Sequence, residues 1–195
     1  STRKESSAAS DVYKRQGVWV DAPVRLYGEH LPVGIRCSGV ASTVGDRADT
    51  CVVSAGIRAM QGWPMDPGMA RAGAELGLAL GGHEARQVTG RMIANTAAVV
   101  VFGPEHRAWM RQEFPEHMGR VLAIGQVARG LGMLPRNRRL PLTQVVEAVT
   151  SGAPRIVDTD WIEDPYGYDD RVKMICAKRI LAAVDILATR VDWGD

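Results

Sequence analysis

The stretch Ala-Ala-Val-Val-Val-Phe, residues 97–102, is the longest apolar run in the chain. It is far shorter than the roughly 20 apolar residues that a membrane-spanning helix needs, so the sequence predicts no membrane partner. The run has the length of a strand and is apolar at every position, which is typical of a strand that is covered on both faces. A parallel sheet between two layers of helices provides that environment. We therefore expect a buried strand inside an α/β domain.

Shorter strands and helices of regular length alternate around this run. Strands are predicted at 51–53, where the turn 54–56 ends the strand, and at 121–124. A first helix is predicted at 66–78, with Asp66 as its N-cap and Pro67 as its first residue, and a short one at 92–93, with Thr89 as its cap. Further helices are predicted at 105–112, 142–149 and 171–190. In the last helix the apolar stripe consists of Val172, Ile175, Ile180, Val184 and Leu187. This alternation predicts a Rossmann-like, three-layer α/β fold, with a four-stranded parallel sheet flanked by helices.

The composition is that of an ordinary globular domain. The chain has 195 residues, of which 46% are hydrophobic and 24% charged, and its formal net charge is +2. This near-neutral balance argues against nucleic acid as a partner, and we expect the basic run 136–139 to be a solvated loop. The three widely spaced cysteines predict neither a disulfide framework nor a metal site. We expect a reducing, cytoplasmic location and no cofactor.

Four segments follow one another in a distinctive order and spacing. They are residues 53–56 followed by 66–67, residues 82–89, residues 99–102 followed by 105–107, and Ile-Glu-Asp-Pro-Tyr-Gly at 162–167, just before the last helix. Together they resemble the low-molecular-weight protein-tyrosine phosphatase family over about residues 51–190. The resemblance implies a hydrolase that removes phosphate from phosphotyrosine proteins through a cysteinyl-phosphate, without a metal ion.

The resemblance assigns roles to residues in three of these segments. Asp164, on a loop and before a proline, is implied to be the catalytic acid, although its turn chemistry alone is more typical of an ordinary turn. Tyr166 is implied to form an aromatic wall for substrate binding, and is otherwise a half-buried surface tyrosine. Ser54 and His83 are implied to support the phosphate-binding loop through hydrogen bonds. A lone histidine after two glycines is more commonly a turn residue.

The nucleophile that the resemblance requires is not in the chain. The family pattern is Cys-x5-Arg-Ser/Thr at the end of the first strand, where backbone amides and the arginine surround the phosphate. Thr43 and Ile57 stand where that arginine would follow Cys37 and Cys51, and Cys176 lies inside the last predicted helix. None of the three cysteines fits the pattern.

The codons of residues 25–34 offer an explanation. Read one nucleotide later, codons for these residues can translate as Val-Cys-Thr-Gly-Asn-Ile-Cys-Arg-Ser, which resembles the family's phosphate loop. We therefore interpret residues 17–50 as an out-of-frame segment that replaces strand 1 and the phosphate loop. Residues 1–16 are interpreted as a non-native tail, and residues 51–195 as the phosphatase-like domain. The apolar stretches 18–20 and 33–35 are candidates to take the place of the first strand, which is central in the expected strand order 2-1-3-4.

Three functions follow from these observations. The first is a phosphotyrosine phosphatase, of which this chain lacks the nucleophile. The second is a thiol-dependent arsenate reductase of the same fold, which needs further redox cysteines that the chain does not offer. The third, favoured for the chain as it stands, is an inactive pseudo-phosphatase or anion-binding domain.

Overall fold

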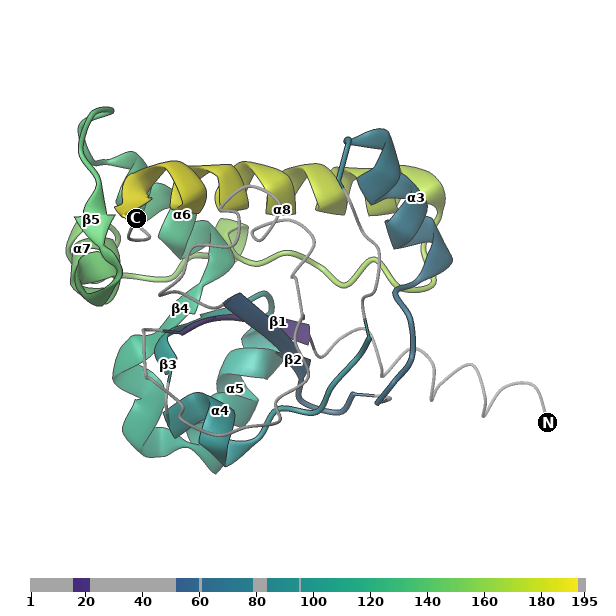
Figure 1. Cartoon of the computed structure of the whole chain (residues 1–195), viewed down its shortest axis with the longest axis horizontal. Coiled ribbons are helices and arrows are strands. Elements are labelled where there is room, and N and C mark those ends of the chain that lie inside the picture. Colours follow the sequence, from purple (N-terminus) through teal and green to yellow (C-terminus); the bar gives the residue numbers. More distant parts are fainter. Residues whose placement is uncertain (1–15, 22–51, 60, 79–83, 95, 193–195) are drawn as a thin grey trace, which may run out of the picture.

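The computed structural model describes residues 16–21, 52–59, 61–78, 84–94 and 96–192. Most of the predicted tail and of the out-of-frame segment, including the strand candidate 33–35, lies outside these residues. In the described part, helices cover a sheet from two sides (Figure 1). The α/β class predicted from the sequence is therefore confirmed.

The main sheet has four strands in the order β2-β1-β3-β4. The strands are β1 (Gln16–Asp21), β2 (Val52–Gly56), β3 (Thr96–Val101) and β4 (Val121–Ala123). Strand β3 pairs with β4 in parallel, with Val99 opposite Val121. Every residue of β3 except Ala97 is buried, so the apolar run that predicted a covered strand lies inside the domain.

Strand β1 contradicts the prediction of an all-parallel sheet. It contains the candidate stretch 18–20, but it runs antiparallel to both neighbours. Gln16 pairs with Gly56 at the end of β2, and Asp21 pairs with Thr96 at the start of β3. Backbone hydrogen bonds form in either direction, and a short β-branched segment carries no signal that fixes its direction. The other three strands therefore point one way and β1 points the opposite way.

One face of the sheet carries α6 (Ile124–Gly132), α7 (Val145–Gly152) and the long α8 (Asp170–Arg190), whose buried side chains form one cluster with Val100 and Leu122. The other face carries α4 (Gly90–Ala94), α5 (Pro104–Glu113) and the 3-10 turn Pro115–Arg120. In Figure 1, α8 lies above the sheet and α4 and α5 lie below it. Helix α3 (Pro67–Glu75) packs against α8.

Several small elements complete the described chain. Strands β5 (Leu140–Pro141) and β6 (Val191–Asp192) form a separate parallel pair. The 3-10 turns Leu142–Gln144 and Asp158–Asp160 precede α7 and the segment that leads to α8. None of the described helices combines the length and apolar character needed to cross a membrane.

Two predicted helix starts are confirmed by their caps. The Asp66 carboxylate accepts a hydrogen bond from the Met69 amide at 2.9 Å, with Pro67 as the first helical residue of α3. The Thr89 hydroxyl accepts from the Met92 amide at 3.3 Å and caps α4. These caps are local in sequence, so the sequence alone reveals them.

Helix α6 is missing from the sequence prediction. It follows β4 without a Ser, Thr, Asp or Asn cap, and the Gln126 side chain accepts from the Ala123 amide instead. Its glycines lower the helix propensity but permit close packing. A Cβ at Gly125 would lie 2.4 Å from the Asp160 backbone, and one at Gly130 would lie 2.7 Å from that of Val149. The helix exists because of tertiary contacts that the local pattern does not show.

The buried face of α8 is also shifted from its predicted stripe. Ile175 is 50% exposed, whereas its neighbours Cys176 and Ala177 are buried. The buried stripe continues through Ala183, Val184 and Leu187. Small residues therefore form much of the contact face, and the larger isoleucine points away from it.

An ion pair between the buried Asp160 carboxylate and Arg129, whose side chain is 42% exposed, joins α6 to the 3-10 turn before the Asp164 loop. Arg129 donates to both carboxylate oxygens of Asp160 at 2.8 and 2.7 Å, and Asp160 also accepts from the Val157 amide. The Asp160 side chain is 1% exposed. Burial disfavours its ionised form, but the hydrogen bonds from Arg129 and Val157 outweigh burial and lower the pKa of Asp160.

Asp160→Asn is expected to lower the free energy of unfolding at pH 7 by about 1–3 kcal/mol, because the amide cannot replace the charged acceptor. The folded pKa is below the unfolded value, so this stabilisation is complete above the unfolded pKa of about 4 and disappears as the pH falls through the folded value. Urea unfolding across this range should show the variant and the original chain converging in acid. Asp158→Asn, at an exposed position of the same turn, is the control; an equal loss there would contradict the assignment.

Candidate active site at the carboxyl edge of the sheet

Strands β2, β3 and β4 end at the same edge of the sheet, and the loop 161–168 is attached to that edge. The Ile162 amide donates to the Phe102 carbonyl, directly after the end of β3, at 3.0 Å. Asp164 follows two residues later. In sheets of this class, ligands bind outside the carboxyl ends of parallel strands, so this loop lies where a ligand is expected.

The loop itself is a closely hydrogen-bonded turn. The Asp164 Oδ1 atom accepts from the Tyr166 amide at 3.0 Å, and the Tyr168 amide donates to the Pro165 carbonyl at 3.2 Å. Gly167 has a φ of +78°, which favours glycine. Asp164 and Tyr166 are both half-buried. The turn chemistry expected from the sequence is thus present, and it holds the carboxyl group in a fixed direction.

Of the two predicted supporting residues, Ser54 and His83, the structure describes only Ser54. Ser54 lies in β2 and is buried, with 8% of its surface exposed. His83 lies outside the described residues. Residues 84–89, which follow His83 in the same segment of the resemblance, reach the end of β2, where the Val88 amide donates to the Gly56 carbonyl at 3.0 Å. Residues 53–56 and 82–89, the first two segments of the resemblance, therefore meet at the carboxyl edge through this hydrogen bond.

Gln87 is a residue of this edge that the sequence interpretation did not single out. Its side-chain oxygen accepts from the Ala59 amide at 2.9 Å, and its nitrogen donates to the Ile57 carbonyl at 3.0 Å. The amide group thereby closes the loop that follows β2. That loop carries Trp63, which is 57% exposed. The partners are distant in sequence, so no local spacing identifies the interaction.

The described edge presents the Asp164 carboxyl group, but no cysteine that the structure describes lies there with an exposed thiol. Cys176 is buried in α8, its thiol donates to the Glu163 carbonyl at 3.5 Å, and burial raises its pKa, which disfavours the thiolate. Cys37 and Cys51 lie outside the described residues. In the described part of the chain, no group of three metal-ligating side chains is placed to hold an ion.

The direction of β1 determines at which edge of the sheet this strand ends. Since Asp21 pairs with the first residue of β3, the chain leaves β1 at the amino edge of the sheet. In a parallel arrangement, the loop after the first strand would emerge at the carboxyl edge, beside Asp164. The described part of the inverted strand therefore ends at the edge opposite the one at which β2, β3 and β4 end.

Comparisons with known proteins place this geometry in context. No protein-family model matches the chain. EpsP of Ralstonia solanacearum, which is named a "probable low molecular weight protein-tyrosine-phosphatase", is 30% identical over 76 residues, 39% of this chain and 52% of the relative. EpsP of Ralstonia nicotianae is 26% identical over 110 residues, 54% of this chain and 76% of the relative. The chain thus spans about half the length of the first relative and three quarters of the second.

Solved structures share the fold at low sequence identity. Vibrio vulnificus Wzb in complex with benzylphosphonate is 19% identical with a TM-score of 0.55, covering 77% of this chain and 84% of its own. The tyrosine phosphatase Wzb from Escherichia coli K30, in complex with sulphate, is 19% identical with a TM-score of 0.51, covering 69% and 73%. The YwlE arginine phosphatase from Geobacillus stearothermophilus is 18% identical with a TM-score of 0.50, covering 69% of each chain. These likenesses confirm the Rossmann-like α/β fold.

Proposed function

We propose that this relative of the low-molecular-weight protein-tyrosine phosphatases derives from a hydrolase of phosphotyrosine monoesters, and that the chain as printed lacks the nucleophile. The observation that carries the proposal is the hydrogen bond from Ile162 to Phe102, because it attaches the Asp164 loop to the carboxyl edge. A carboxyl group fixed beside a half-buried tyrosine suits a substrate with an aromatic leaving group.

The reaction has two steps in the frame-restored protein, by which we mean the chain with residues 17–50 translated in the shifted frame. The cysteine thiolate attacks phosphorus, the bond from phosphorus to the phenolic oxygen breaks, and Asp164 gives its proton to that oxygen. Asp164, now a carboxylate, then takes a proton from water as the water oxygen attacks the cysteinyl-phosphate. The thiolate and inorganic phosphate are released. No metal ion or other cofactor takes part in this scheme.

The proposal includes an out-of-frame origin for residues 17–50. The inverted direction of β1 supports it, since a strand from the original frame would run parallel to β2 and β3 and deliver the phosphate loop to the Asp164 edge. Sequencing the DNA of codons 17 to 51 tests this origin directly. Codons that cannot yield cysteine and arginine in the shifted frame would reject it.

The two alternatives are the arsenate reductase and the inactive, anion-binding domain. The arsenate reductase needs accessible redox cysteines, and Cys176 is buried with its thiol hydrogen-bonded. The arginine phosphatase among the fold neighbours shows that the fold alone does not select the substrate. For the chain as printed, an inactive domain that binds anions at most is the expected outcome, because both the thiolate and the arginine of the phosphate loop are missing.

Aryl phosphate hydrolysis by the frame-restored protein is the experiment that tests the phosphatase function. For the chain as printed, circular dichroism melts with and without phosphate test the remaining anion binding. A cooperative transition that phosphate shifts upward would show a retained anion site. A cooperative transition that phosphate leaves unchanged would show an inactive fold without one.

A further inference from the structure

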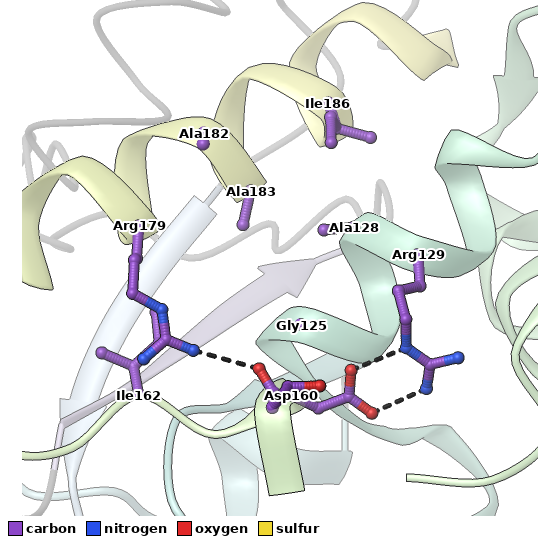
Figure 2. A pocket seen from close by; sticks show the side chains of 10 residues that line it. Gly125, Ala128, Arg129, Asp160, Ile162, Arg179, Ala182, Ala183 and Ile186 are labelled. Carbon is purple, nitrogen blue, oxygen red and sulfur yellow. Dashed lines mark hydrogen bonds and ion pairs between the residues drawn. The ribbon is translucent and has the colours of Figure 1, made fainter. Parts of the chain in front are cut away.

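A cavity of about 280 Å³ lies between α6, the segment 159–162 and α8 (Figure 2). The cavity shares Ile162 with the loop of the candidate active site, but Asp164 and Tyr166 do not line it. Its walls come from three elements that the tertiary fold brings together. Nothing in the proposed phosphatase reaction uses this space.

The cavity exists because the helices that face it carry small residues. Ala128 of α6, the buried Ala183 and the exposed Ala182 of α8 line it together with two larger apolar side chains, Ile162 and Ile186. Figure 2 shows these side chains surrounding the space, with the two arginines on either side of Asp160. The part of an occupant that contacts these side chains therefore meets hydrocarbon, which favours an apolar body.

The two arginines at the cavity differ in their charge balance. Arg129 is neutralised by the two hydrogen bonds to the Asp160 carboxylate. Arg179 donates through Nη2 to the carbonyls of Thr159 and Trp161, at 3.0 and 2.9 Å, and carbonyls carry no net charge. Among the residues that the structure describes, no carboxylate forms an ion pair with Arg179. The cavity thus combines apolar walls with one arginine that has no carboxylate partner among the described residues.

We propose that this cavity binds a small amphipathic carboxylate, with the hydrocarbon body between Ile162 and Ile186 and the carboxylate on Arg179. Guanidinium and carboxylate groups form strong charge-assisted hydrogen bonds, and the Nε and Nη1 donors of Arg179 are in addition to those that hold the carbonyls. The volume is at the small end of ligand sites, which suits a body about the size of an octyl chain. The proposal does not depend on the phosphatase function.

Octanoate, kept below its micelle concentration, is the probe for the full-length chain labelled with ¹³C at the isoleucine methyl groups. Saturable shifts are expected for the methyl groups of Ile162 and Ile186. Ile93, fully buried on the other face of the sheet, is the internal control and should not shift. Binding of 1-octanol, which has the body without the charge, and of acetate, which has the charge without the body, should each be at least about tenfold weaker.

Two pairs of variants separate the charge from the cavity. Arg179→Gln should weaken octanoate binding at least about tenfold, whereas Lys178→Gln, its exposed neighbour outside the lining, should leave binding unchanged. Ala182→Leu should fill the cavity and weaken binding similarly, whereas Ala74→Leu, at an exposed position of α3, should not. Thermal melts identify any variant that has lost its fold.

Three results would overturn the proposal. The first is the absence of saturable shifts at Ile162 and Ile186 at millimolar octanoate. The second is equal affinity for 1-octanol, which would show an apolar hollow without charge recognition. The third is an equal loss of binding in the variants and their matched controls. Each of these can be observed without any enzymatic activity.

Discussion

The frame-restored chain is expected to hydrolyse p-nitrophenyl phosphate, and the chain as printed is expected to show no activity above the uncatalysed rate. The difference is close to all-or-none because the restored segment supplies three groups together: the thiolate, the backbone amides around the phosphate, and the arginine that stabilises the charge of the transition state. Of the reacting groups, the described residues offer only Asp164, the proposed proton donor, and protonation of the leaving oxygen accelerates the reaction only while a nucleophile attacks phosphorus.

Vanadate should inhibit the restored activity, because it takes the geometry of phosphorus in the transition state. The matched control is the restored chain with serine in place of the first cysteine of the restored loop. It keeps the loop and loses the nucleophile, and we expect it to be inactive. Activity of this serine control, or of the chain as printed, would show that a different group attacks phosphorus. An inactive restored chain that melts cooperatively would reject the phosphatase function itself.

The sequence predicted those parts of the fold whose signals are local. The run 97–102 is apolar at every position and becomes the buried strand β3, and the carboxylate of Asp66 caps α3 within one turn. Helix α8 begins and ends within a residue of its prediction because its pattern is long. The cap is a contact between residues that are close in sequence, and the buried strand is recognised by the apolar character of its whole length.

The parts that the sequence missed depend on distant contacts. Helix α6 contains Gly125 and Gly130, which oppose a helix locally but allow backbone contact with Asp160 and Val149. The side chain of Gln87 bonds to backbone groups 28 and 30 residues away, so its role at the site edge has no local signature. The direction of β1 is likewise a property of its pairing partners, and nothing in 18–20 specifies it.

The candidate site shows the same division. Its position at the end of β3 followed from the α/β pattern together with the order of the four segments, and the Ile162 amide is bonded there. The direction of β1 did not follow from the sequence, although it determines at which edge of the sheet this strand ends. Because β1 lies between β2 and β3, its inversion changes the pairing of the sheet. It also changes the edge at which the strand ends, and therefore the site.

Asp164→Asn in the frame-restored chain is expected to lower kcat by about 10²–10⁴-fold, with little change in KM. The substitution is chosen because an asparagine oxygen can still accept the hydrogen bond from the Tyr166 amide, so the turn is kept while the acidic proton is lost. Asp164→Ala should lose the same catalysis and loosen the turn as well. The loss in both variants therefore reports on the proton, and the difference between them reports on the loop.

The leaving group provides the sharper measurement of this role. An acid that protonates the departing oxygen matters most when that oxygen is basic, so the loss should be larger for phenyl phosphate than for p-nitrophenyl phosphate. Glu163→Gln, which removes the adjacent exposed carboxylate, is the control and should retain most of the activity. If the loss in Asp164→Asn is equal for both substrates, or equals that of Glu163→Gln, then Asp164 holds the loop in place without transferring the proton.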